Sequence, residues 1–87
     1  MYEAASRLFN DYIKNVLVGQ GWKIVRVHEN AFVLKGVDGI ETFATCYVEQ
    51  YLDQERYSVF VKFDWDKYAP IGTVAKIDGE YKIFELE

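Results

Sequence analysis

Ile40–Phe63, with the sequence IETFATCYVEQYLDQERYSVFVKF, is the stretch that decides the fold of this chain. It contains two long strand-like runs, Ile40–Tyr51 and Arg56–Asp64, joined by the polar turn Leu52-Asp53-Gln54-Glu55. Aromatic and β-branched runs separated by a short polar stretch are typical of a β-hairpin. We expect the turn to pair Leu52 with Glu55, and this register determines which side chains share a face.

The two faces of this predicted hairpin differ in character. One face carries mostly small and β-branched side chains that suit contact with a helix: Ile40, Ala44, Cys46, Val48, Val59, Val61 and Phe63. The second face carries aromatic side chains, Phe43, Tyr47, Tyr51 and Phe60, interleaved with the charged residues Glu41, Glu49, Arg56, Lys62 and Asp64. A single helix can cover only one face, so the sequence offers no obvious cover for the aromatic one.

The helix itself is predicted over Glu3 to Val18. Its apolar residues recur at the spacing of one helical face: Ala4, Ala5, Leu8, Phe9, Tyr12, Ile13, Val16 and Leu17. Gly19-Gln20-Gly21 follows directly, and glycine readily adopts the left-handed conformation that ends a helix. We therefore expect one amphipathic helix that lies flat on a sheet.

Four further strands are predicted on either side of the central hairpin. Trp22–His28 and Ala31–Gly36 precede it, although the first loop leaves open whether Trp22/Ile24 or Val25/Val27 faces the core. Val37-Asp38-Gly39-Ile40 is predicted to be a type I′ turn. That turn pairs Val33 with Ala44 and places Phe32 and Leu34 on the same face as Phe43.

A second Asp-Gly hairpin joins Ile71–Ile77 to Glu80–Leu86 through Asp78-Gly79. Its register places one set of side chains on one face: Ile71, Thr73, Ala75, Ile77, Phe84 and Leu86. Val74, Tyr81 and Ile83 then lie on the other. The expected fold is α+β, with one N-terminal helix packed on a curved antiparallel meander sheet of about six strands. This element order resembles that of cystatin-like α+β cups, in which one helix lies across a curved sheet.

The length and the charge limit the classes of function. At 87 residues the chain forms a single domain, residues 1–87. The net charge of −4 and the absence of a Lys/Arg run disfavour direct nucleic-acid or anionic-membrane binding. No apolar run approaches the length of a membrane span, and no signal peptide is visible, so we expect a cytoplasmic protein.

Catalytic and metal-binding constellations are not recognisable in the sequence. Cys46 and His28 form no spaced pair, and a lone cysteine in a Val-rich strand is usually an inert packing residue. One His and one Cys cannot supply the usual zinc ligand set, and Asp64-x-Asp66 lacks the later ligands of a calcium loop. We therefore expect no cofactor, and the sequence favours a non-enzymatic protein while leaving a small enzyme as an alternative.

The aromatic second face remains as the candidate site. Monomeric proteins rarely leave a large contiguous apolar patch bare. The face could close on itself within a strongly curled sheet, pack against a second copy or another protein, or form a cup for a small apolar or aromatic ligand. Our candidate partner-binding residues share this face: Phe32, Phe43, Tyr47, Tyr51, Phe60, Glu49, Arg56 and Lys62.

The expected function is that of a small non-enzymatic binding protein, a homodimer or an accessory to another protein, which uses this face. A small-molecule-binding cup or a small enzyme using the same face is the second interpretation. An acidic inhibitor that imitates nucleic acid is the third, because many carboxylates lie in predicted turns and at strand ends: Asp53, Glu55, Asp64, Asp66, Asp78, Glu80, Glu85 and Glu87.

Overall fold

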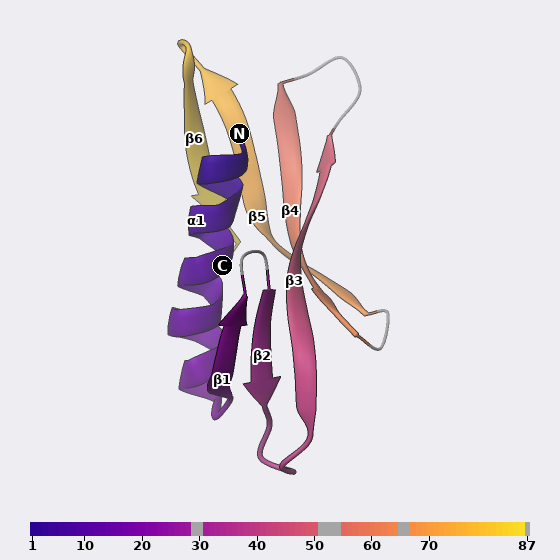
Figure 1. Ribbon diagram of the computed structural model, residues 1–87. Helices are drawn as coiled ribbons and strands as arrows, with labels where there is room; N and C mark the ends of the chain where they lie inside the picture. The colour runs from indigo at the N-terminus through magenta and orange to yellow at the C-terminus, as the bar shows by residue number, and fades with distance from the viewer. Residues whose placement is uncertain (29–30, 51–54, 65–66, 87) are drawn as a thin grey trace.

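A computed structural model of the chain describes residues 1–28, 31–50, 55–64 and 67–86. The helical segment comprises α1 (Tyr2–Tyr12), a π-helical turn η1 (Ile13–Leu17) and a 3-10 turn η2 (Val18–Gln20). Six strands follow: β1 (Lys23–His28), β2 (Ala31–Lys35), β3 (Glu41–Gln50), β4 (Arg56–Phe63), β5 (Tyr68–Ile77) and β6 (Glu80–Glu85). They form one antiparallel sheet in the order β1-β2-β3-β4-β5-β6, as the predicted meander requires (Figure 1).

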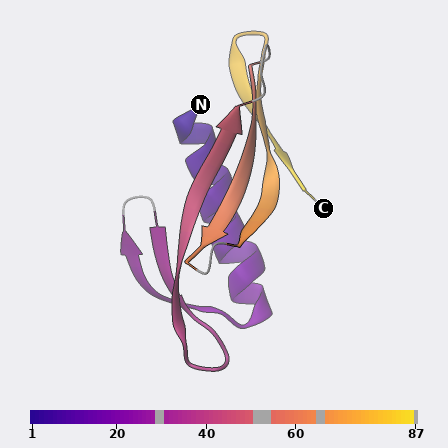
Figure 2. The ribbon, with the colours of Figure 1, turned by 90° about the vertical axis from the view of Figure 1, so that its right-hand side faces the viewer.

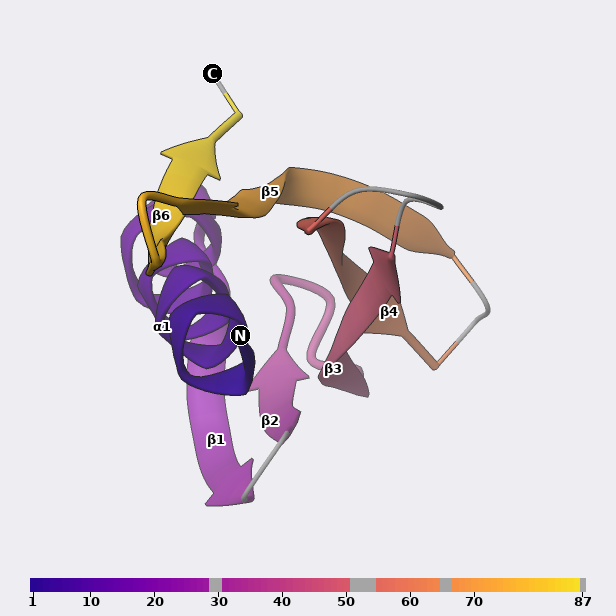
Figure 3. The ribbon, with the colours of Figure 1, turned by 90° about the horizontal axis from the view of Figure 1, so that it is seen from above.

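The sheet curls into a half-barrel, and the helix lies inside the curl. Seen from above, the strands follow an arc from β1 to β6, with α1 at the open side between these two edge strands (Figure 3). The view onto the outer side of the long strands shows the helix crossing behind them (Figure 2). The α+β prediction is confirmed, and one face of the sheet is on the outside of the curl.

The helix is wound so that its apolar stripe meets the concave face of the sheet. Ala5, Leu8 and Phe9 are buried in α1, and Ile13 and Leu17 in η1. The wide π turn, in which the Val18 N–H donates to the Ile13 carbonyl, keeps Ile13 and Leu17 inward but leaves Val16 exposed. The predicted stop is confirmed at Gly21, which has a left-handed φ of 97°.

The hydrophobic core lies between this helix and the concave face. Phe9 and Phe32 make a tilted ring contact at 5.6 Å, and Trp22 stacks on Phe63 at 6.3 Å. The buried core residues come from the helix and from four strands: Ala5, Leu8, Phe9, Ile13, Leu17, Phe32, Leu34, Ala44, Val59, Val61, Phe63, Ile71 and Val74. Burial of this apolar area is the main stabilising contribution.

The registers of two predicted hairpins are confirmed. In the central one, Ala44 lies opposite Phe63 and Tyr47 opposite Phe60. The turn that should pair Leu52 with Glu55 falls partly on residues 51–54, outside the described chain. In the last hairpin, Ile77 pairs with Glu80, and positive φ at both Asp78 and Gly79 gives the type I′ turn.

The predicted register of the second hairpin is wrong by one residue. Val33 pairs with Phe43 rather than with Ala44, because the loop has three central residues instead of two. Only Gly39 has positive φ there, the Gly39 N–H donates to the Gly36 carbonyl, and the Asp38 carboxylate accepts the Ile40 N–H at 3.0 Å. The one-residue shift moves Phe32 and Leu34 to the concave face, where both are buried.

Two bulges modify the remaining faces. A register shift between Ile24 and Arg26 allows Trp22 and Ile24 to pack on the core, which settles the open alternative for the first strand. A second shift, where Val59 pairs with Gly72 and Phe60 with Pro70, makes Ile71 an extra residue that is buried rather than outward-facing. Ile40, predicted on the core face, precedes β3 and is exposed.

Candidate functional site

Four aromatic side chains of the outer face lie on three neighbouring strands, and we call this set the aromatic face. Phe43 and Tyr47 lie on β3, Phe60 on β4 and Tyr68 on β5. Phe43 is 48% exposed, Tyr68 45% and Tyr47 38%, while Phe60 is half-buried between its neighbours. Because α1 lies on the concave side, none of the described helical residues covers these rings.

Tyr47 is the centre of the aromatic face. Its ring lies 5.9 Å from that of Phe60, its direct cross-strand neighbour, and 5.2 Å edge-on from that of Tyr68. Lys62 places its ammonium group 5.4 Å from the Tyr68 centroid. Edge-to-face rings and a cation over a ring face are favourable arrangements of aromatic quadrupoles. Tyr47, Phe60 and Tyr68 therefore form one connected group of rings.

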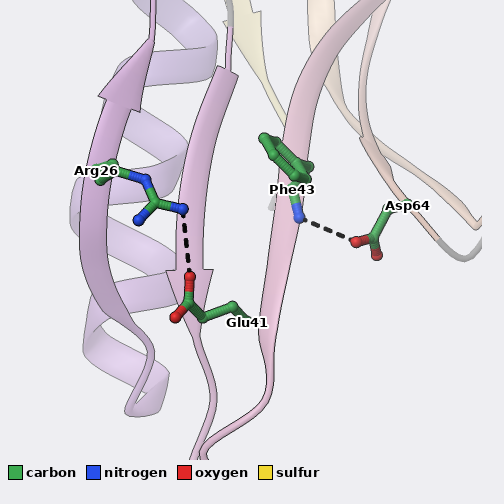
Figure 4. A network of polar contacts seen from close by, with 4 residues as sticks. All are labelled: Arg26, Glu41, Phe43 and Asp64. Carbon is green, nitrogen blue, oxygen red and sulfur yellow. Dashed lines mark hydrogen bonds and ion pairs between the residues drawn. The ribbon is translucent and has the colours of Figure 1, made fainter.

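Charged groups surround these rings. The Tyr47 hydroxyl donates to the Glu49 carboxylate at 3.2 Å, and this hydrogen bond, followed by the negative charge of Glu49, raises the pKa of Tyr47. Arg56 is exposed at the start of β4, opposite Ala75. Arg26 and Glu41 form an exposed ion pair at 3.4 Å near Phe43 (Figure 4). The surface thus has an aromatic centre and a rim of both charge signs.

On the part of the outer face formed by β1, β2 and the start of β3, one aliphatic side chain is buried although the helix lies on the other face. Val33 is only 1% exposed, yet it lies outside the core cluster and opposite both Arg26 and Phe43 in the adjacent strands. The His28 ring lies 6.3 Å from the Phe43 ring. These neighbours extend the aromatic face toward β1.

Asp64 supports the aromatic face through hydrogen bonds. Its carboxylate accepts a hydrogen bond from the hydroxyl of Thr42, which is 3% exposed, and another from the Phe43 N–H at 3.3 Å (Figure 4). A carboxylate that satisfies a buried hydroxyl and a backbone donor fixes the end of the β3–β4 ladder. Asp64 therefore holds Phe43 in position at the end of this face.

Sequence reasoning placed most of the candidate residues on this face, with one error and one omission. Phe32 lies in the core against Phe9 because of the register shift, and Tyr51 lies outside the described residues. Tyr68 was missed because Pro70 suggested an irregular segment, whereas β5 already begins at Tyr68. Alternation from Tyr68 to Pro70, which lie on the outer face opposite Lys62 and Phe60, is the signal that could have identified it.

Cys46 and His28 lie on opposite faces of the sheet. The Cys46 thiol is 3.9 Å from the Ala5 carbonyl oxygen, and burial raises its pKa to about 11, so it is neutral near pH 7. No three His, Cys, Asp or Glu side chains among the described residues gather into a possible metal site. Nor does any helix in the described part of the chain have the length and apolar character needed to cross a membrane.

Two clefts flank the helix on the concave side. The first, of about 490 Å³, lies between the N-terminal half of α1 and the upper part of β3. Its lining is shared by the helix, β2, β3 and β4: Met1, Tyr2, Ala5, Ser6, Phe9, Asn10, Ala31, Phe32, Cys46, Tyr47, Val48, Gln50 and Tyr57. The second, of about 430 Å³, lies between the helix and the segment Glu85–Leu86.

Comparisons with known proteins found no matching family model, no similar curated protein and no similar solved structure.

Proposed function

We propose that this chain is a small non-enzymatic binding protein, and that it works by packing the aromatic face against a protein surface, in the first instance a second copy of itself. One observation carries the proposal: Phe43, Tyr47 and Tyr68 are each more than a third exposed on one face of the sheet, and the rings of Tyr47 and Tyr68 are in contact. Isolated exposed apolar residues need no explanation, but a contiguous ordered group does.

The composition of the face supports a protein partner. Tyr and Phe are enriched at the centres of protein interfaces, where their rings bury large areas and lose little side-chain entropy. The polar tips of Tyr47 and Tyr68 suit a surface that is wet in the free protein and partly dry in a complex. The charged rim formed by Glu49, Arg56 and Lys62 fits the usual division into an apolar centre and a polar edge.

The charges on the rim favour self-association among the protein partners. A twofold dimer uses the same patch on both copies, so the patch must be complementary to itself. Lys62 and Arg56 of one copy can face Glu49 and Glu41 of the other, because both signs occur on one face. A patch of one charge sign would repel its copy.

The other interpretations have less support. The outer face is convex, which favours a protein surface over a small molecule as its partner (Figure 3). For the nucleic-acid mimic, two of the carboxylates concerned are engaged within the protein: Asp64 accepts from Thr42, and Glu80 pairs with Lys82 at 3.1 Å. A mimic needs free carboxylates at a regular spacing.

Sedimentation equilibrium at about 1–100 µM tests the proposal with a matched pair of variants. We expect a reversible dimer that Tyr47→Ser weakens by about tenfold or more, the scale of an interface hot spot. Tyr81→Ser is the control: Tyr81 is 37% exposed and contacts Tyr57 at 6.4 Å, but it lies on the other face of the sheet. Equal effects of the two variants would contradict the role of the face.

A monomer at 100 µM would contradict the homodimer and leave another protein as the partner. That version is tested with a photo-crosslinking amino acid in place of Tyr68 or, as the control, Tyr81. A discrete cross-linked species from position 68 only is expected. Cross-links of equal yield at both positions, or at neither, would remove the aromatic face as a protein-binding site.

A further inference from the structure

Strand β3 is twice as long as its neighbour β2, and this leaves part of one edge without a strand. The pairing of β2 with β3 ends where Ala31 meets Thr45, whereas β3 continues to Gln50 and stays paired with β4 on its other side. His28 already pairs with Ala31, so the chain has turned back before it could reach Val48. Figures 1 and 2 show β3 rising well beyond the β1–β2 hairpin.

The hydrogen-bonding groups of Val48 and Gln50 point toward this empty side. The Ile40 carbonyl accepts from Gly36 on the β2 side, while the Phe43 N–H points to Asp64 on the β4 side. The N–H and C=O groups of successive residues point to alternate sides of a strand. Those of the even-numbered residues of β3 therefore point toward the β2 side. Beside Val48 and Gln50 no strand of the described chain occupies that side.

The cleft of about 490 Å³ opens onto this edge. Its lining includes Phe32, Cys46 and Val48 from the concave face, but also Ala31 and Tyr47, which belong to the outer face by register. The cleft therefore reaches around the edge of β3. Its other wall is the first two turns of α1, where Ala5 and Phe9 supply apolar surface.

The edge strands β1 and β6 carry features that prevent the addition of another strand, whereas the free part of the β3 edge does not. Lys23 and Arg26, together with the bulge between Ile24 and Arg26, mark edge strand β1. Edge strand β6 carries charges along its length: Glu80, Lys82 and Glu85. Charges and bulges are the usual devices that prevent strand addition. The side chains that line the cleft include no charged residue, in a chain of which 28% is charged.

The geometry points to a peptide-binding site, at which an extended, uncharged segment of a partner protein adds to β3 antiparallel, in line with β2. Main-chain hydrogen bonds to Val48 and Gln50 supply the pairing. Alternate side chains of the added segment point the same way as Val48 and enter the apolar cleft beside Ala5. Five paired residues correspond to a length of about 17 Å.

Charge decides what kind of segment fits. Burying an unpaired ammonium or carboxylate against Phe32, Cys46 and Val48 would carry a large desolvation cost. Apolar β-branched residues at the inward positions can meet Ala5, Phe9 and Val48, and Ser6 and Asn10 add neutral polar groups to the same lining. The expected sequence alternates small β-branched residues inward with neutral polar residues outward. This site is separate from the aromatic face, apart from Tyr47, which borders both.

The test uses the probe N-acetyl-Val-Thr-Val-Thr-Val-amide and amide hydrogen exchange followed by NMR. Saturating peptide is expected to slow exchange at Val48 and Gln50 by at least tenfold. The same peptide N-methylated at its central valine lacks a donor toward β3 and is expected to bind at least tenfold more weakly. No peptide binding up to 1 mM, or equal binding of the methylated peptide, would overturn the proposal.

Two variants separate binding from folding. Gln50→Pro removes the Gln50 N–H, which points to the empty side and makes no hydrogen bond to β4. The thermal midpoint should therefore stay near that of the wild type, while peptide affinity falls about tenfold. Ser6→Lys introduces a charge at the cleft and should also weaken peptide binding, whereas Asn15→Lys, outside this cleft on the same helical segment, should not. Unchanged peptide affinity in both test variants would contradict the site.

Two other occupants are distinguished in the same experiment. Concentration-dependent protection of Val48 without peptide would show that a second copy occupies the edge. Binding of the neutral dye N-phenyl-1-naphthylamine without any peptide binding would show a small-molecule cleft. Either result overturns the peptide assignment.

Discussion

The rings of Tyr47 and Tyr68 meet edge to face with centroids 5.2 Å apart, although strand β4 lies between their strands. Both rings lie on the same face because the bulge at Ile71 pairs Phe60 with Pro70 and Lys62 with Tyr68. The result is an exposed aromatic group that spans three strands and is held in one arrangement before binding.

Tyr68→Ser is expected to weaken self-association to a similar degree as Tyr47→Ser, and the double variant to lose less than the two single losses combined. The reason is that each ring orients the other, so removing one already disorders the pair. Sedimentation equilibrium of the wild type, the two single variants and the double variant measures the coupling free energy between the two rings. Strict additivity would show that the two rings act independently, contrary to the preorganised face.

Gly72→Ala is expected to destabilise the fold by about 1–3 kcal/mol, the usual cost of overpacking. A Cβ at Gly72 would lie 2.5 Å from the Phe84 carbonyl oxygen and 2.8 Å from Cδ2 of Leu8. The control is Gly19→Ala, where nothing lies within 4 Å, and it should stabilise by about 0.5–1 kcal/mol through the unfolded state. Urea unfolding measures the change in the free energy of unfolding for both variants. An unchanged stability of Gly72→Ala would contradict the close approach of Leu8 in the helix and of β6 to Gly72.

The Cys46 thiol should react about a hundredfold more slowly with iodoacetamide in the folded protein than in urea at pH 8. Burial raises its pKa from 9.0 to about 11, so the reactive thiolate is correspondingly scarce. The folded state holds this proton more tightly, so the contribution to stability is present below pH 9 and is lost as the pH rises toward 11. Between pH 9 and 11, Cys46→Ala should therefore lose less free energy of unfolding than the wild type does. Equal reaction rates would contradict the position of the thiol under α1.

Asp64→Ala should cost about 1–3 kcal/mol, because it leaves the buried Thr42 hydroxyl and the Phe43 N–H without their acceptor. Thr42→Val in the Asp64→Ala background should recover part of that loss, since the unsatisfied hydroxyl is then gone. Urea unfolding of the wild type, the two single variants and the double variant measures the coupling free energy between Asp64 and Thr42. No recovery would show that Thr42 contributes nothing to the penalty.

The parts of the fold that followed from local pattern were predictable. The central hairpin register and the face bearing Phe43, Tyr47 and Phe60 came from period-2 alternation alone. The two Asp-Gly turns could not be told apart by sequence: Asp78 takes positive φ, whereas Asp38 does not, and accepts the Ile40 N–H instead. The choice at Asp38 is made by burial of Phe32 and Leu34 under the helix, a tertiary effect.

The remaining parts of the candidate site depend on geometry that no local pattern encodes. Tyr68 joins the aromatic face only because a bulge lets β5 carry Pro70 beside Phe60. The open edge of β3 follows from the difference in length between β2 and β3, which rests on where each strand stops. Alternation predicts faces well and strand ends poorly.

The most direct measurement of the central claim is an isotope-filtered NOE experiment on a sample mixed from labelled and unlabelled protein at about 0.5 mM. Intermolecular NOEs from the rings of Phe43, Tyr47, Phe60 and Tyr68 are the predicted result. Intermolecular NOEs confined to Tyr81 and other residues of the helix side, or none at all, would contradict the proposal that the aromatic face is where copies of this protein meet.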